Sequence, residues 1–130
     1  MAAIDFRFQT PLRRVRGLGS AKSGTEHFWL QRVTALANLL LSIAMVIVVI
    51  MLAGRNYDAA RALLSRPLIG ALLALFVISG CVHMRIGMQV VIEDYLHGGA
   101  KIAAVIANTF FAIAVGAASL FALAKLAFGN

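Results

Sequence analysis

Four side chains of this 130-residue chain could take part in redox or proton chemistry: His83, Asp94, Tyr95 and Arg32. His83 lies directly after an apolar run. An ionisable group inside a membrane helix is costly, and it usually faces the interior of a helix bundle, where it binds a cofactor or relays protons. The His83 imidazole could therefore be an axial ligand of a haem iron, or it could form a hydrogen bond across a close helix interface.

The surface around His83 is predicted to be flat. Gly80 and Gly87 lie three residues before and four residues after His83, which places all three on one face of a helix. Such a face would admit either the backbone of a partner helix or a large planar ring. One histidine supplies only one axial bond, so a second haem ligand would have to come from another chain.

Asp94 and Tyr95 form a second candidate site. Asp94 follows His83 by eleven residues, which at about 100° per residue is about 20° past three full rotations, so one continuous helix would carry both on one stripe. A carboxylate beside a phenol could hydrogen-bond a quinone carbonyl and manage its protons. The alternative is simple solvation, because tyrosine is common at membrane interfaces and acidic residues often end helices in water.

Arg32 is the third candidate, at the head of the first long apolar segment. Its guanidinium offers a fixed fork of donors that suits an anion, such as a haem propionate or a carboxylate of a quinone site. The alternative is a cation that extends to the interface and marks the cytoplasmic side of the membrane.

Three apolar segments must position these residues. The chain is 62% hydrophobic and 13% charged, against roughly 45–50% and 25% in soluble domains, so we predict an all-α membrane protein. The expected spans are about 33–52, 67–92 and 102–124, and each is long enough for the hydrocarbon core at about 1.5 Å per residue. A basic segment, 1–32, precedes the three-helix membrane part, 33–130.

Charge and cysteine content exclude other classes of protein. Six of the twelve Lys and Arg residues precede residue 33, which is typical of a cytoplasmic end, so the net charge of +7 does not predict a nucleic-acid partner. With the N-terminus inside, eight of these cations lie on the cytoplasmic side and four outside. The single cysteine, Cys81, allows no disulfide within the chain and no thiolate metal cluster.

Two stretches of the sequence resemble a known family. HMRIGMQVVIEDYLH and RVRGLGSAKSGTEHFWLQRVTALA are similar to the hydrophobic membrane anchor subunits of bacterial succinate dehydrogenase, the small three-helix partners of the cytochrome b subunit. The family pattern has two parts. Near the start of the first span it has a glycine, an aromatic residue, an arginine and a threonine, and in the second span it has a histidine followed by a Gly-Met pair and an Asp-Tyr pair. The matching positions here are His83, Gly87, Met88, Asp94, Tyr95, Gly24, Phe28, Arg32 and Thr34.

The resemblance implies a role for each candidate residue. It implies that His83 is an axial ligand of haem b, with the second axial histidine supplied by the cytochrome b subunit. It implies that Tyr95 hydrogen-bonds ubiquinone and that Asp94 supports that site. It places Arg32 near the haem propionates or the quinone pocket.

The resemblance also implies a function for the whole chain. The expected protein is a multi-pass anchor in the bacterial cytoplasmic membrane and has no catalytic activity of its own. It would be a subunit of respiratory complex II, which links the tricarboxylic acid cycle to the respiratory chain. Its expected partners are the flavoprotein, iron-sulfur and cytochrome b subunits, together with lipid and ubiquinone. Two alternatives are a purely structural, haem-free anchor, and a small transport subunit in which His83 and Asp94 relay protons.

Overall fold

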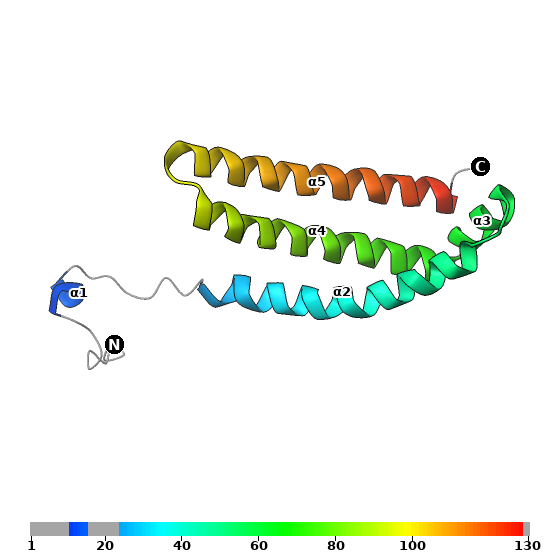
Figure 1. Ribbon diagram of the computed structural model, residues 1–130, viewed down its shortest axis with the longest axis horizontal. Helices are drawn as coiled ribbons and strands as arrows, with labels where there is room; N and C mark the ends of the chain where they lie inside the picture. Colours follow the sequence, from blue (N-terminus) through cyan, green and yellow to red (C-terminus); the bar gives the residue numbers. More distant parts are fainter. Residues whose placement is uncertain (1–10, 16–23, 129–130) are drawn as a thin grey trace, which may run out of the picture.

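A computed structural model describes residues 11–15 and 24–128, and shows helices joined by short connections (Figure 1). The helices are α1 (Pro11–Val15), α2 (Gly24–Leu52), α3 (Tyr57–Leu64), α4 (Pro67–Tyr95) and α5 (Gly98–Phe128). No strand occurs in the described residues. Helices α2, α4 and α5 are long and apolar enough to cross a membrane, which confirms the predicted all-α fold with three membrane-spanning helices.

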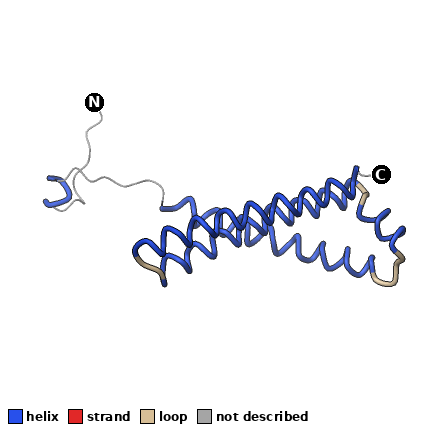
Figure 2. Tube along the Cα trace, turned by 90° about the horizontal axis from the view of Figure 1, so that it is seen from above, coloured by secondary structure: helices blue, strands red, loops and turns tan. Residues whose placement is uncertain are grey.

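The three long helices lie side by side, with α4 in the middle (Figure 1). Helix α4 packs against α2 on one side and against α5 on the other. The start of α2, the end of α4 and the start of α5 therefore gather at one end of the molecule, while α3 and the end of α5 lie at the other (Figures 1 and 2). The EDY sequence is thus at the same end as the start of α2, as the predicted topology requires; which side of the membrane this end faces stays a prediction.

Each long helix extends beyond the apolar span expected from the sequence. Helix α2 begins at Gly24, and Glu26 in its first turn complements the positive end of the helix dipole. Helix α4 runs to Tyr95, so His83 and Asp94 share one continuous helix, and α5 begins at Gly98, which has a positive φ of 63°. Hydropathy marks only the part of a helix that suits lipid, whereas the hydrogen-bonded helix continues into the interface.

The short helix α3 was not expected from the sequence. The chain turns at Gly54, whose φ is +74°, and the Asn56 side chain then caps α3 by accepting a hydrogen bond from a backbone N–H of its first turn at 3.0 Å. Leu63 of α3 is buried together with Val48 of α2 and Ile69 of α4. Helix α3 therefore closes one end of the molecule, where Figure 2 shows α2 diverging from α4 and α5.

Most apolar side chains lie on the outer surface. In each long helix only 6% of the most apolar window is buried within the chain, and large residues such as Leu39, Ile43 and Phe110 are exposed. Apolar surface on this scale must contact lipid or other polypeptides. The three long helices therefore form a single layer with little interior of its own (Figure 1).

Candidate functional site

The His83 imidazole lies at the interface between α4 and α2. Its Nδ1 atom is 3.0 Å from the hydroxyl oxygen of Thr34, which is only 8% exposed. One turn before His83, the Ser79 hydroxyl donates a hydrogen bond of 3.4 Å to the backbone carbonyl of Thr34. The two contacts hold the histidine against α2, forty-nine residues earlier in the chain.

The surroundings of Thr34 determine which imidazole nitrogen carries the proton. The Thr34 hydroxyl lies 2.7 Å from the carbonyl oxygen of Leu30 and 3.1 Å from that of Gln31. With its single hydrogen donated to these carbonyls, the Thr34 hydroxyl can only accept from the imidazole, and this assigns the proton to Nδ1 of His83. Nε2 then carries the lone pair, and among the described residues it has no hydrogen-bond partner.

The two glycines beside His83 have different surroundings. A Cβ at Gly80 would meet nothing within 4 Å, so the surface there is open. A Cβ at Gly87 would lie 3.4 Å from the Gln31 side-chain nitrogen of α2. The flat face expected from the sequence is therefore open at Gly80, whereas the Gln31 side chain lies against it at Gly87.

Two buried polar atoms on α2 flank Thr34. The side-chain oxygens of Gln31 and Asn38, about one turn to either side, are buried without a hydrogen-bond partner in the described part of the chain. An unsatisfied buried acceptor costs about 1–3 kcal/mol, so such atoms are usually paired. Each of these two oxygens therefore carries such a cost in the described chain.

Asp94 and Tyr95 occupy the last turn of α4, and both are exposed, Tyr95 to 80%. Their neighbour Glu93 accepts a hydrogen bond of 2.9 Å from Gln89, whereas no other described residue pairs with the Asp94 carboxylate or the Tyr95 hydroxyl. At about 1.5 Å per residue, Asp94 lies about 16 Å from His83 along the helix axis. The candidates therefore form two separate groups on one helix.

Arg32 does not join His83 within this chain. It is two residues before Thr34, so it points about 160° away from Thr34 around α2. Its guanidinium carbon lies 4.3 Å from the centre of the Phe28 ring, a cation–π contact on an exposed surface. The role near a haem propionate or the quinone pocket stays a prediction.

The functional geometry includes one residue to which sequence reasoning gave no role. Thr34 is part of the sequence pattern noted above, but only the approach of α2 to α4 brings it to His83. The described residues contain no group of three or more His, Cys, Asp or Glu that could hold a metal ion. A single imidazole with a free Nε2 and an adjacent open surface does fit a haem, because the porphyrin nitrogens supply most of the iron ligands and this chain needs to provide only one.

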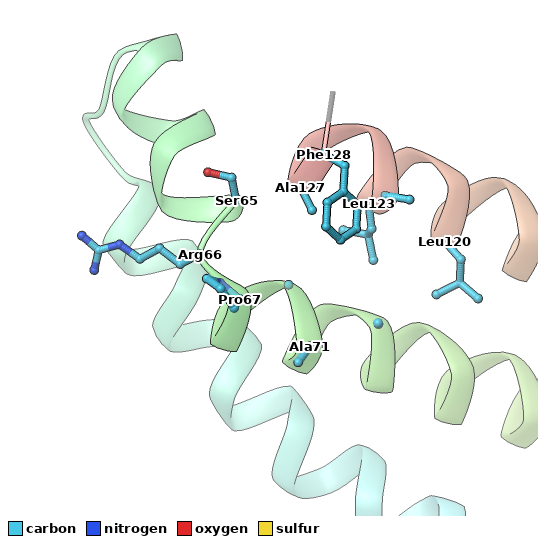
Figure 3. Close-up of a pocket in the computed structure, with 11 residues that line it drawn as sticks. Ser65, Arg66, Pro67, Ala71, Leu120, Leu123, Ala127 and Phe128 are labelled. Carbon is cyan, nitrogen blue, oxygen red and sulfur yellow. The ribbon is translucent and has the colours of Figure 1, made fainter. Parts of the chain in front are cut away.

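A pocket of about 370 Å³ lies at the opposite end of the molecule, between the start of α4 and the end of α5. Its lining is mostly apolar, with Pro67, Leu120 and Phe128 around it, and Arg66 extends away from it (Figure 3). It contains none of the candidate residues.

Comparisons with known proteins agree with the sequence resemblance. The family model described as succinate dehydrogenase/fumarate reductase transmembrane subunit matches residues 7–123. The succinate dehydrogenase hydrophobic membrane anchor subunit of Paracoccus denitrificans is 40% identical over 123 residues, which is 95% of each chain. The protein of the same name from Rickettsia bellii (strain RML369-C) is 37% identical over 72% of this chain and 74% of its own. No solved structure matches significantly.

Proposed function

This chain belongs to the family of succinate dehydrogenase/fumarate reductase transmembrane subunits, as a hydrophobic membrane anchor subunit, and we propose that it supplies one axial ligand of haem b and part of the ubiquinone-reduction site. The observation that carries this proposal is the environment of His83. Its Nδ1 is fixed to Thr34, its Nε2 has no partner among the described residues, and the adjacent surface at Gly80 is open.

In the proposed haem site, Nε2 of His83 would hold the iron, and a histidine of the cytochrome b subunit would supply the other protein ligand. The haem contributes one-electron redox capacity, and the protein tunes it through ligation, burial and hydrogen bonding. Arg32 is placed to pair with an anion approaching the exposed side of α2, either a haem propionate or a carboxylate of the quinone pocket.

In the proposed quinone site, the Tyr95 hydroxyl donates a hydrogen bond to a quinone carbonyl oxygen. Reduction of a quinone to a quinol consumes protons as well as electrons, and the Asp94 carboxylate is placed to hold or transfer them at the end of α4. The 80% exposure of Tyr95 means that this chain supplies one wall of the pocket. The cytochrome b and iron-sulfur subunits supply the others.

The proposed complex is anchored in the bacterial cytoplasmic membrane, with the start of α2 and the end of α4 on the cytoplasmic side. Electrons from succinate would reach this end through flavin and iron-sulfur centres held by the flavoprotein and iron-sulfur subunits. Protons for the quinone are taken up from the same side. The chain binds and positions, and it performs no chemistry without these partners.

Two variants of the purified complex test the proposal. His83→Ala should lose the b-type signal in a reduced-minus-oxidised spectrum, because it removes the iron ligand. Tyr95→Phe should keep that signal and the oxidation of succinate by an artificial acceptor, but lose quinone reductase activity. An unchanged haem content in His83→Ala would exclude the ligand role and favour the haem-free structural anchor, while full quinone reductase activity in Tyr95→Phe would exclude the quinone role of Tyr95.

A further inference from the structure

We propose that Thr34 is a positioning residue for haem ligation: its hydroxyl accepts the Nδ1–H of His83 and holds the imidazole in the tautomer and orientation that present Nε2 to the iron. This inference rests on the proposed ligand role of His83. It assigns to α2 a part of the haem site that a list of iron ligands would omit.

The first argument is the direction of the hydrogen bonds. Nδ1 of His83 lies 3.0 Å from the Thr34 hydroxyl oxygen, and that hydroxyl donates to the Leu30 carbonyl over 2.7 Å, which leaves Nδ1–H as the donor to Thr34. A neutral imidazole has one donor and one acceptor nitrogen, so fixing the proton on Nδ1 leaves Nε2 as the acceptor, which is the form a metal requires. Ligating histidines in proteins commonly donate their other N–H to such a partner.

The second argument is rigidity. Thr34 is 8% exposed, and a β-branched side chain in a helix has few rotamers, here fixed further by the bond to the Leu30 carbonyl. The Ser79 hydroxyl bonds the backbone carbonyl of Thr34, which holds α2 and α4 together beside the histidine. The position of the acceptor is therefore set by the packing of two helices, and the ring is oriented before haem binds.

The third argument concerns the electronic effect of the contact. A hydrogen bond that withdraws the Nδ1 proton makes the imidazole a better electron donor to the metal. Because the Thr34 hydroxyl itself donates to a carbonyl, the two bonds polarise one another and strengthen this effect. Better donation favours the ferric state, so removing the hydroxyl should raise the reduction potential of the haem as well as weaken its binding.

The test compares variants of the purified complex. Thr34→Val keeps the size and branching of the side chain but removes the hydroxyl, and we expect about a 10-fold or greater loss of haem affinity and a higher midpoint potential. Thr34→Ser restores the hydroxyl and should return both quantities to near the wild-type values. Ser79→Ala is the matched control, because it removes the neighbouring hydrogen bond between the same two helices and leaves Nδ1 bonded. A wild-type potential and haem content in Thr34→Val would overturn the inference.

The experiment separates this inference from the proposed function. If His83→Ala keeps the b-type haem, the ligand assignment itself is wrong. If His83→Ala loses haem while Thr34→Val behaves as wild type, only the role of Thr34 is wrong. If Thr34→Val does not assemble, Thr34→Cys keeps a side chain of similar size with a weaker acceptor. It should shift the potential in the same direction by less, and an unshifted potential would refute the role of Thr34.

Discussion

Replacing Gly80 with leucine should separate the folding of this chain from the assembly of its cofactor site. A Cβ at Gly80 would meet nothing within 4 Å, so the new side chain begins in open space within the chain. Replacing glycine in a helix interior with a residue of higher propensity gains about 0.5–1 kcal/mol, so the subunit alone should fold at least as well as wild type. Any defect must then arise from what covers this face in the complex.

The expected defect follows from the position of Gly80 beside His83. If a haem or a partner helix packs against the bare backbone, inserting a leucine there overpacks the contact and costs about 1–3 kcal/mol. At about 1.4 kcal/mol per factor of ten, this is a loss of roughly 5- to 100-fold in the affinity of whatever lies on the face. Loss of haem from an assembled complex would show that the ring covers Gly80, and loss of assembly would show that a partner backbone does.

The assay is the ratio of haem to protein in the purified complex, together with the amount of complex recovered from membranes. Ala107→Leu is the matched control, because it adds a similar bulk on an exposed position of α5, next to Asn108, whose side chain bonds the Arg85 carbonyl near His83. Gly80→Leu with normal haem content and normal assembly would refute the reasoning that this face is covered closely.

Three further predictions concern the remaining candidates. Asp94→Asn keeps the size of the side chain but removes the carboxylate, so quinone reductase activity should fall by about 100-fold with an unchanged haem spectrum, and full activity would exclude a proton-handling role. Arg32→Lys keeps the positive charge but loses the planar guanidinium, so haem retention or quinone affinity should fall by about 10-fold if Arg32 binds an anion of the haem or quinone site. Unchanged haem retention and an unchanged KM for quinone would show that Arg32 is only an exposed cation. In Gly116→Leu, the new side chain should overpack against the Cys81 sulfur, which lies 3.5 Å from the Cβ position, cost about 1–3 kcal/mol and lower the recovery of the complex. Adding Cys81→Ala to this variant should partly restore the recovery. Equal recovery of the wild type, the single variant and the double variant would contradict close packing at this point.

The architecture was predictable from the sequence because it depends on local composition. An uncharged apolar run of about 20 residues has few structural options other than a spanning helix. The eleven-residue interval between His83 and Asp94 predicts a shared stripe, and the uninterrupted helix that this stripe requires is confirmed in α4. The start of α2 at Gly24 was not predicted, because hydropathy does not register a helix that continues through GTEHFWLQR into the interface.

The contacts of the site could not be predicted from the sequence, because they depend on how the helices pack against one another. Thr34 is polar in an apolar helix, and such a residue often bonds only to a carbonyl of its own helix. Its pairing with His83, forty-nine residues away, depends on the rotation and height of α2 against α4. The same pairing decides that Gln31 covers Gly87 while Gly80 stays open, although the sequence places both glycines on one face.

A haem needs surroundings on both faces of its ring, and one layer of three helices cannot provide them. Helix α4 lies between α2 and α5 (Figure 1), so a group bound to Nε2 of His83 must lie against the layer rather than inside it. The buried side-chain oxygens of Gln31 and Asn38 lack donors in the described chain, and they flank the residue that orients the histidine. We therefore expect a second layer of helices to close the ring from the other side. Because both oxygens are buried and unpaired within the described chain, Gln31→Leu and Asn38→Leu should leave the subunit at least as stable as wild type, and a clear loss of stability in either variant would show that its oxygen is paired.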